Sequence, residues 1–353
     1  MNNINGGKAT GLDALPARFV KDGSSIIARP LTHIINLSLS TGIIPQDLKA
    51  ARVTPAVTCK TLLYAGDTAL LVSGKNTADL EHALATELKA VKEWLIENKL
   101  SLHLGKTESI LFGSKRKLAQ TSNLHIKCGE NDIACKSNVK YLGLPLDQSL
   151  TGESIAQNII RKCNAKLGFL YRQARKFNID TKRTLVSALV QCHLDYACSA
   201  WYSGLSQRYK NRLQTTQNKM IRFILGLPAR AHIGYAEFSR VGMLPIQQRV
   251  AQLKLNHMFN IIHNEAPTYR MSNITWVHNQ HQFNTRSSTT SLSLPRSKTK
   301  HFGQTTFSYT AINHWNQLPT DIQLIDTKHS YKKAVRKYLF QQVANNESNI
   351  FIS

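Results

Sequence analysis

Residues 62–72 read LLYAGDTALLV. Apolar residues stand on both sides of Ala65-Gly66-Asp67-Thr68, and glycine and aspartate are residues that favour tight turns. The stretch therefore predicts a β-hairpin of two short strands. Because a two-stranded hairpin alone is only marginally stable in water, we expect it to pack against the helix that follows it.

The sequence after the hairpin predicts one helix and then several short strands. Asp79 is suited to cap the helix, because its side chain can accept a hydrogen bond from a backbone N–H of the first turn. Segments at 100–104, 108–112, 125–128 and 139–146 have the alternating pattern of strands. The apolar residues of the helix recur at three- and four-residue steps: Leu80, Leu84, Leu88, Val91, Trp94 and Leu95.

From residue 155 onward the pattern becomes helical. Gly226 and Pro228 end the third of four predicted helices. Residues 270–300 are rich in Ser, Thr and Asn and predict a loop or linker, and a last helix is expected from Ser330 to Val343. The four apolar stripes are Ile155, Ile159, Cys163, Leu167 and Leu170; Leu185, Leu189 and Cys192; Leu213, Met220, Ile221 and Ile224; and Ile246, Val250, Leu253, His257 and Ile261.

The 353-residue chain has an ordinary globular composition, 42% hydrophobic and 19% charged, which suits two or three domains. Its net charge is +24, and residues 151–353 hold 27 Lys and Arg against 8 Asp and Glu. Like charge repels itself unless a partner neutralises it, so we expect RNA or DNA, bound through its backbone without sequence preference. A solvated basic surface is the plain alternative, and an anionic membrane surface is the weaker one. The candidate contacts are Arg161, Lys162, Lys166, Arg172, Arg175, Lys176, Lys182 and Arg183.

The sequence has no apolar run long enough to span a membrane and no apolar leader in its first 25 residues. Its six cysteines contain no C-x-x-C pair, so we expect reduced thiols rather than disulfides or a structural zinc site. These features predict an intracellular protein that is not secreted, and they leave nucleus and cytoplasm open.

Several motifs in order resemble a known family. Tyr64-Ala65-Gly66-Asp67 resembles the Y-x-D-D hairpin of reverse transcriptases. The chain as a whole resembles the reverse transcriptases of non-LTR (LINE-type, jockey-like) retrotransposons, with an internal deletion. The similar segments are GLDALPARFVKDGS at 11–24, LTHIINLSLSTGIIPQDLKAARVTP at 31–55, ENKLSLHLGKTE at 97–108, YLGLPLD at 141–147, CHLDYACSAW at 192–201 and HWNQLP at 314–319.

The resemblance implies an α+β fold. A reduced palm-like hairpin and sheet with helices would be followed by a mostly helical, thumb-like C-terminal half. The implied segments are a fingers-like fragment at 1–58, a partial palm at 59–150, a helical thumb-like region at 151–264, and a basic, polar linker with a C-terminal helix at 265–353.

The resemblance also implies an RNA-directed DNA polymerase that has lost its activity. Nucleotide addition needs two divalent ions, Mg²⁺ or Mn²⁺, held by carboxylates. Gly66 occupies the position of the first hairpin aspartate, which leaves Asp67 as the metal ligand, and no room exists between Pro55 and Thr61 for the palm strand that carries the other aspartate. Poor metal binding would slow the step by roughly three to four decades.

Each role that the resemblance implies has a structural alternative. Tyr64 is either beside the catalytic site or a half-buried strand aromatic, and Asp67 is either a metal ligand or a turn residue. Lys106 either faces an incoming triphosphate or is a solvated loop lysine. Leu142 and Gly143 either set backbone against a primer or form a tight turn. Three hypotheses follow: an inactive polymerase fragment, a nonspecific nucleic-acid-binding module, and a genomic remnant without a stable fold.

Overall fold

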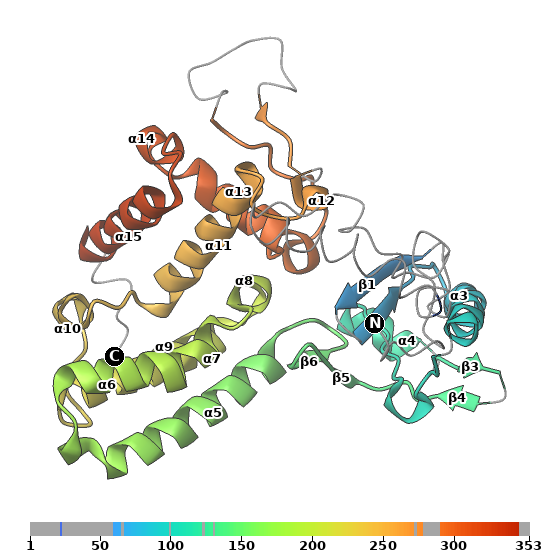
Figure 1. The fold of residues 1–353 in the computed structure, drawn as a ribbon, viewed down its shortest axis with the longest axis horizontal. Coiled ribbons are helices and arrows are strands. Elements are labelled where there is room, and N and C mark those ends of the chain that lie inside the picture. The colour runs from blue at the N-terminus through green and yellow to red at the C-terminus, as the bar shows by residue number, and fades with distance from the viewer. Residues whose placement is uncertain are drawn as a thin grey trace. The chain divides into compact units, whose positions relative to one another are not determined.

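The computed structural model describes residue 22 and residues 59–64, 67–98, 100–121, 124–129, 131–271, 274–277 and 290–345. It has two units, residues 1–143 (unit 1) and residues 144–353 (unit 2) (Figure 1). The fingers-like segment predicted for 1–58, except Asp22, and the turn glycine Gly66 lie outside the described residues. The division into four segments stays a prediction.

The predicted hairpin is confirmed in unit 1. Strands β1 (Lys60–Tyr64) and β2 (Asp67–Leu71) pair antiparallel, with Tyr64 opposite Asp67 at the turn. Leu70 of β2 packs against a small buried cluster to which the following helix, α3 (Thr77–Glu97), contributes Leu88.

Helix α3 begins one turn earlier than predicted. The Asn76 side chain, not that of Asp79, caps it: Asn76 Oδ1 accepts a hydrogen bond of 2.8 Å from the Asp79 backbone N–H. The apolar face of α3 packs on the hairpin of β3 (Ile126–Cys128) and β4 (Asn131–Ile133) around buried Leu88.

Two predicted strands of unit 1 are wrong. Residues 104–106 form the short helix η2 (Leu104–Lys106), because the chain turns back so that the Thr107 N–H donates to the His103 carbonyl. Of residues 108–112, only Ser109 forms a β-bridge, to Cys135. Among the described residues of unit 1, β1–β2 and β3–β4 are separate two-stranded sheets. The remaining elements of this unit are α4 (Lys115–Gln120) and β5 (Asn138–Tyr141).

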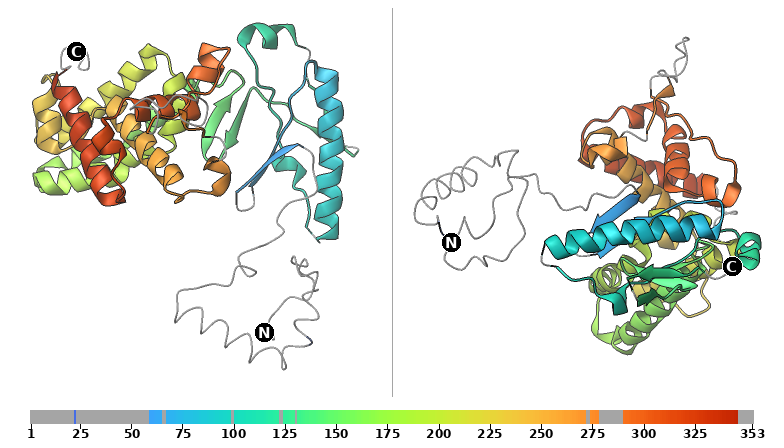
Figure 2. Two further views of the ribbon diagram at one scale, coloured as in Figure 1. Left: turned by 90° about the horizontal axis from the view of Figure 1, so that it is seen from above. Right: turned by 90° about the vertical axis from the view of Figure 1, so that its right-hand side faces the viewer.

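Unit 2 is mostly helical, so the class is α+β with small antiparallel hairpins and predominating helices. Helices α5 (Glu153–Arg172) and α9 (Gln207–Leu225) lie side by side, and α11 (Ile246–Ile262) packs against α13 (Phe307–Asn316) and α15 (Lys328–Asn345) (Figures 1 and 2). Within the described residues, no helix is both long and apolar enough to cross a membrane. The elements are β6 (Leu144–Asp147), α5 (Glu153–Arg172), η3 (Ala174–Lys176), α6 (Ile179–Val186), the π-helix η4 (Ser187–Gln191), α7 (Cys192–Asp195), α8 (Cys198–Trp201), η5 (Tyr202–Gly204), α9 (Gln207–Leu225), α10 (Tyr235–Val241), α11 (Ile246–Ile262), α12 (Thr268–Met271), η7 (Lys300–Gln304), α13 (Phe307–Asn316), α14 (Thr320–Gln323) and α15 (Lys328–Asn345).

The first and third predicted stripes are confirmed as core, and the second is wrong by one residue. All five stripe residues of α5 and all four of α9 are buried, and Gly226 ends α9 with a φ of 68°. In the second stripe Cys192 is exposed, whereas Val186, Val190 and Leu194 are buried. Leu185 and Leu189 are only partly buried against the core, because the buried positions 186, 190 and 194 keep a four-residue helical spacing that begins one residue later than predicted.

Residues 265–353 contain more structure than the predicted linker and final helix. The final helix is confirmed as α15, but α13 and α14 precede it. Trp315 of α13 and Tyr331 of α15 join α11 residues in a second buried cluster. The fourth predicted stripe is partly wrong, because His257 is exposed while neighbouring positions of α11 are buried nearly all round.

Candidate nucleic-acid interface

Helix α5 divides its residues between an apolar and a basic face. Its buried side packs against α9, because Ile155, Ile159, Cys163, Leu167 and Leu170 recur at helical steps. The opposite side carries exposed basic residues. Lys162 and Lys166 stand four residues apart, and Arg161 and Arg172 stand eleven apart, about three turns, so each pair lies at nearly the same angle around the helix. We call this surface the α5 basic face: Arg161, Lys162, Lys166 and Arg172.

In the part of the chain that the structure describes, no carboxylate pairs with the α5 basic face. Arg161 instead donates to the Asn158 side-chain oxygen at 3.1 Å. Burial lowers the pKa of nearby His193, and the charges of Lys162 and Lys166 lower it further. The site is therefore a region of net positive potential.

The other predicted basic contacts differ in availability. Arg175 and Lys176 of η3 are exposed. Lys182 is half-buried, with Nζ 5.6 Å from the ring centre of Phe223. Arg183 pairs with Asp180 at 2.8 Å, which partly cancels its charge. The α5 basic face and η3 are thus the stronger candidates for phosphate contacts.

The predicted polymerase residues at the hairpin come together only in part. Tyr64 and Asp67 face each other across the turn, and Tyr64 is 66% exposed rather than half-buried. A two-ion centre needs several carboxylate ligands. In the described part of the chain, no group of three or more His, Cys, Asp and Glu side chains could hold a metal ion. The described residues around Asp67 therefore do not supply the ligand set of a two-metal centre.

Lys106 and the turn at Leu142 and Gly143 belong to other parts of unit 1. Lys106 is exposed at the end of η2, where its backbone N–H donates to the His103 carbonyl at 3.0 Å. Leu142 and Gly143 have φ values of 45° and 80°, so they form the tight turn that the sequence predicts as one of its alternatives. The left-handed conformation of Leu142 costs roughly 1–2 kcal/mol.

A buried lysine was missed by the sequence analysis. Lys254 of α11 is 1% exposed, and its Nζ donates to the hydroxyls of Ser203 at 2.5 Å and Thr310 at 2.6 Å. Burial lowers its pKa to about 8. The local sequence, Leu253-Lys254-Leu255, does not indicate that the lysine points inward. Its hydrogen-bond partners, Ser203 and Thr310, lie about fifty residues away in opposite directions along the chain.

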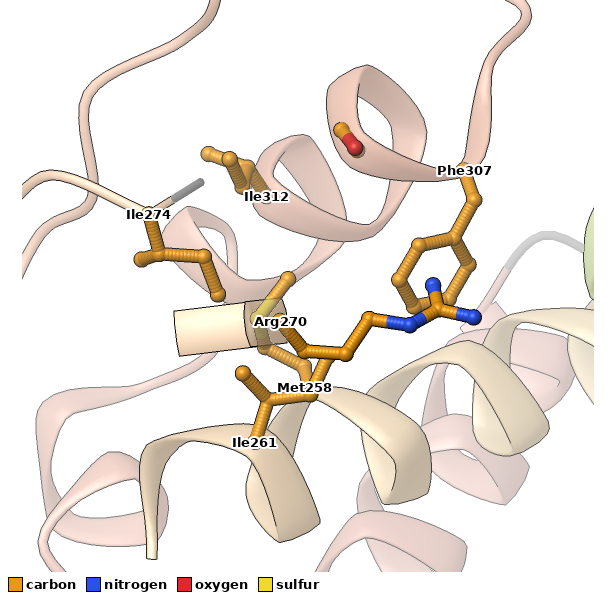
Figure 3. A pocket seen from close by; sticks show the side chains of 7 residues that line it. Met258, Ile261, Arg270, Ile274, Phe307 and Ile312 are labelled. Carbon is orange, nitrogen blue, oxygen red and sulfur yellow. The ribbon is translucent and has the colours of Figure 1, made fainter. Parts of the chain in front are cut away.

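A small cavity lies between α11 and α13. Its volume is about 50 Å³, and the Arg270 side chain extends across it toward Phe307 (Figure 3). Pockets that bind nucleotides or other small molecules usually have several hundred Å³. This cavity is therefore too small for a nucleotide.

Comparisons with known proteins identify no relative: no protein-family model matches the chain, and neither a curated protein nor a solved structure resembles it significantly.

Proposed function

We propose that this protein binds RNA or DNA without sequence preference, through backbone phosphates held by the α5 basic face and η3. The single observation that supports the proposal is the α5 basic face itself, four exposed cations that no carboxylate of the described residues pairs with. A polyanion would neutralise them and release its own counterions.

The salt dependence of binding tests the proposal. If Arg161, Lys162, Lys166, Arg172, Arg175 and Lys176 each neutralise one phosphate, affinity falls roughly a thousandfold between about 50 and 200 mM salt. Filter binding of a labelled oligonucleotide measures this slope. An affinity that does not change with salt would contradict the proposal.

Paired double variants locate the interface. The double variant Lys162→Gln with Lys166→Gln should reduce the magnitude of the slope of log affinity against log salt concentration by about two. Lys332→Gln with Lys333→Gln removes the same charge from exposed positions of α15 and should leave the slope unchanged. Equal effects of the two double variants would mean that the net charge of the protein, rather than the α5 basic face, governs binding.

We further propose that the chain is a fragment of a non-LTR reverse transcriptase with reduced palm-like and thumb-like parts, and that it does not polymerise DNA. The motif series supports the family, and the lone Asp67 at the hairpin supports inactivity. The test is primer extension by the full chain with Mg²⁺ or Mn²⁺. We expect no template-dependent incorporation, and incorporation that Asp67→Asn abolishes would refute inactivity.

A further inference from the structure

Phe169 is an exposed aromatic residue in the middle of the α5 basic face. Its side chain is 53% exposed. Lys166 stands three residues before it, Lys162 seven before it and Arg172 three after it, so all four share one side of the helix. An apolar ring amid charged groups in water contributes nothing to the core that the other side of α5 forms.

The surroundings of Phe169 leave room for a flat ligand. The guanidinium carbon of Arg172 lies 5.8 Å from the centre of the Phe169 ring. At the adjacent Gly168, an added Cβ would meet no atom within 4 Å apart from its chain neighbours and the backbone of its own helix turns. Ala165, one turn earlier, is small and exposed. An aromatic ring, a planar cation and small neighbours together make a surface on which a planar base can lie.

Tyr171, two residues away, shows what an aromatic residue with a structural role looks like here. Its hydroxyl donates to the Lys219 carbonyl at 3.2 Å, and its ring meets Phe223 edge-on at 5.0 Å. Among the described residues, Phe169 makes no such contact with another aromatic ring. The packing that explains Tyr171 therefore does not explain the position of Phe169.

We propose that Phe169 is a stacking platform for an unpaired base, so that the α5 basic face binds single-stranded nucleic acid in preference to duplex. This inference rests on the proposed nucleic-acid binding. The cations hold the phosphates of either form, but bases inside a duplex are already stacked on both sides and present no free face. Stacking of a base on an aromatic side chain tolerates any sequence, which suits binding that has no sequence preference.

Fluorescence anisotropy with the full chain and four labelled probes tests this inference. The probes are a single strand of about 16 nucleotides, a length that covers known single-strand sites, as DNA and as RNA, the matching DNA duplex, and a DNA strand with abasic positions along its middle. We expect Phe169→Ala to weaken binding of the single strands about tenfold and binding of the duplex less than twofold. Against the abasic strand, which keeps the phosphates, Phe169→Ala should have no effect.

Further variants separate stacking from other causes. Phe169→Tyr keeps a flat ring and should restore single-strand binding, whereas Phe169→Leu keeps an apolar side chain and should behave as alanine does. Circular dichroism checks that each variant is folded, as the exposure of the side chain leads us to expect.

Each outcome has a defined meaning. Equal loss for single strand and duplex, an alanine effect that persists on the abasic strand, or full activity of Phe169→Leu would overturn the stacking platform while leaving phosphate binding intact. Wild-type protein that binds none of the probes, or binds them without salt dependence, would overturn the proposed function and this inference with it. Unequal results for DNA and RNA single strands, both sensitive to Phe169→Ala, would support the platform and assign its preference.

Discussion

Replacing Lys254 with methionine tests whether the interior of unit 2 holds a charged group. Lys254 is 1% exposed, and its two hydrogen-bond partners, Ser203 and Thr310, are neutral hydroxyls. Burial lowers the pKa of Lys254 from 10.5 to about 8. At about 1.4 kcal/mol per pH unit, the buried charge reduces the free energy of unfolding by about 3 kcal/mol at pH 7. The two hydrogen bonds of Lys254 offset part of this cost. We therefore expect Lys254→Met to be more stable than the wild type at pH 7 by about 1 kcal/mol.

The pH dependence of this difference is the sharper measurement. Between pH 8 and 9 the folded protein releases the Lys254 proton, while the unfolded chain, with a lysine pKa of 10.5, keeps it. The stability of the wild type therefore rises with pH. Its free energy of unfolding should increase by about 1 kcal/mol relative to that of Lys254→Met between pH 8 and 9. Burial raises the pKa of Cys163 and Cys198 from 9.0 to about 12, which lowers stability above pH 9. The charge of Lys254 lowers the pKa of Cys198, but up to pH 9 both thiols stay protonated in the folded state with or without that charge, so their contribution cancels in the comparison.

Urea unfolding followed by circular dichroism at pH 7, 8 and 9 measures both quantities. Lys332→Met, at an exposed position of α15, is the control for loss of a lysine without burial and should show no such pH-dependent difference. A difference between wild type and Lys254→Met that stays constant from pH 7 to 9 would refute a buried lysine with a lowered pKa.

Three other predictions concern unit 2. Burial, with the charge of Lys254, lowers the pKa of His314 to about 4, so stability should fall as the pH drops from 6.5 toward 4. In urea titrations His314→Gln should reduce that slope, and the part due to His193 and His257, whose pKa values are also lowered, should remain. Arg249 Nε and a terminal nitrogen lie 3.2 Å and 2.8 Å from the Asp195 carboxylate oxygens; a double-mutant cycle with Asp195→Asn and Arg249→Met should give a coupling of roughly 1 kcal/mol, and a value near zero would contradict the pair. Gly226→Ala should cost roughly 1–2 kcal/mol because φ is 68°, measured as a lower melting temperature.

Local patterns predicted the parts of the fold that depend on local physics. The apolar residues of α5 recur every three or four positions, and a helix that buries one face against a neighbour needs only that spacing. Gly226 ends α9 because glycine adopts a left-handed φ without strain. The hairpin followed from turn residues between two apolar runs, and its pairing from Lys60 to Leu71 agrees with that reasoning.

Features that depend on distant parts of the chain could not be predicted in this way. The π-helix at Ser187–Gln191 was not predicted, because its sequence, SALVQ, is equally compatible with an ordinary α-helix. The inward position of Lys254 depends on hydroxyls supplied by η5 and α13. No helix was predicted at α13, and the burial of Trp315 there depends on packing with α11 and α15, which no local pattern shows.

The candidate site shows the same division. Exposed cations could be predicted, since lysine and arginine are almost never buried without a partner, and Arg161, Lys162, Lys166 and Arg172 are all exposed. Phe169 could not, because aromatic residues usually belong to a core and its neighbour Leu170 does. The helical spacing of the sequence places Leu170 on the buried stripe and leaves Phe169 off it, but the spacing alone assigns Phe169 no role.

The opposed faces of α5 explain how the helix can keep a surface that is unfavourable in the unbound protein. Lys162 and Lys166 are like charges at i and i+4, a pair that destabilises a helix by about 0.2–0.5 kcal/mol. Each fully buried side chain on the other face, such as Leu167, contributes roughly 1.5–3 kcal/mol. The core therefore exceeds the repulsion by several fold, and the charges can remain unpaired until a phosphate backbone neutralises them. Because the repulsion is relieved only on binding, it adds to affinity for a polyanion rather than to the stability of the free fold.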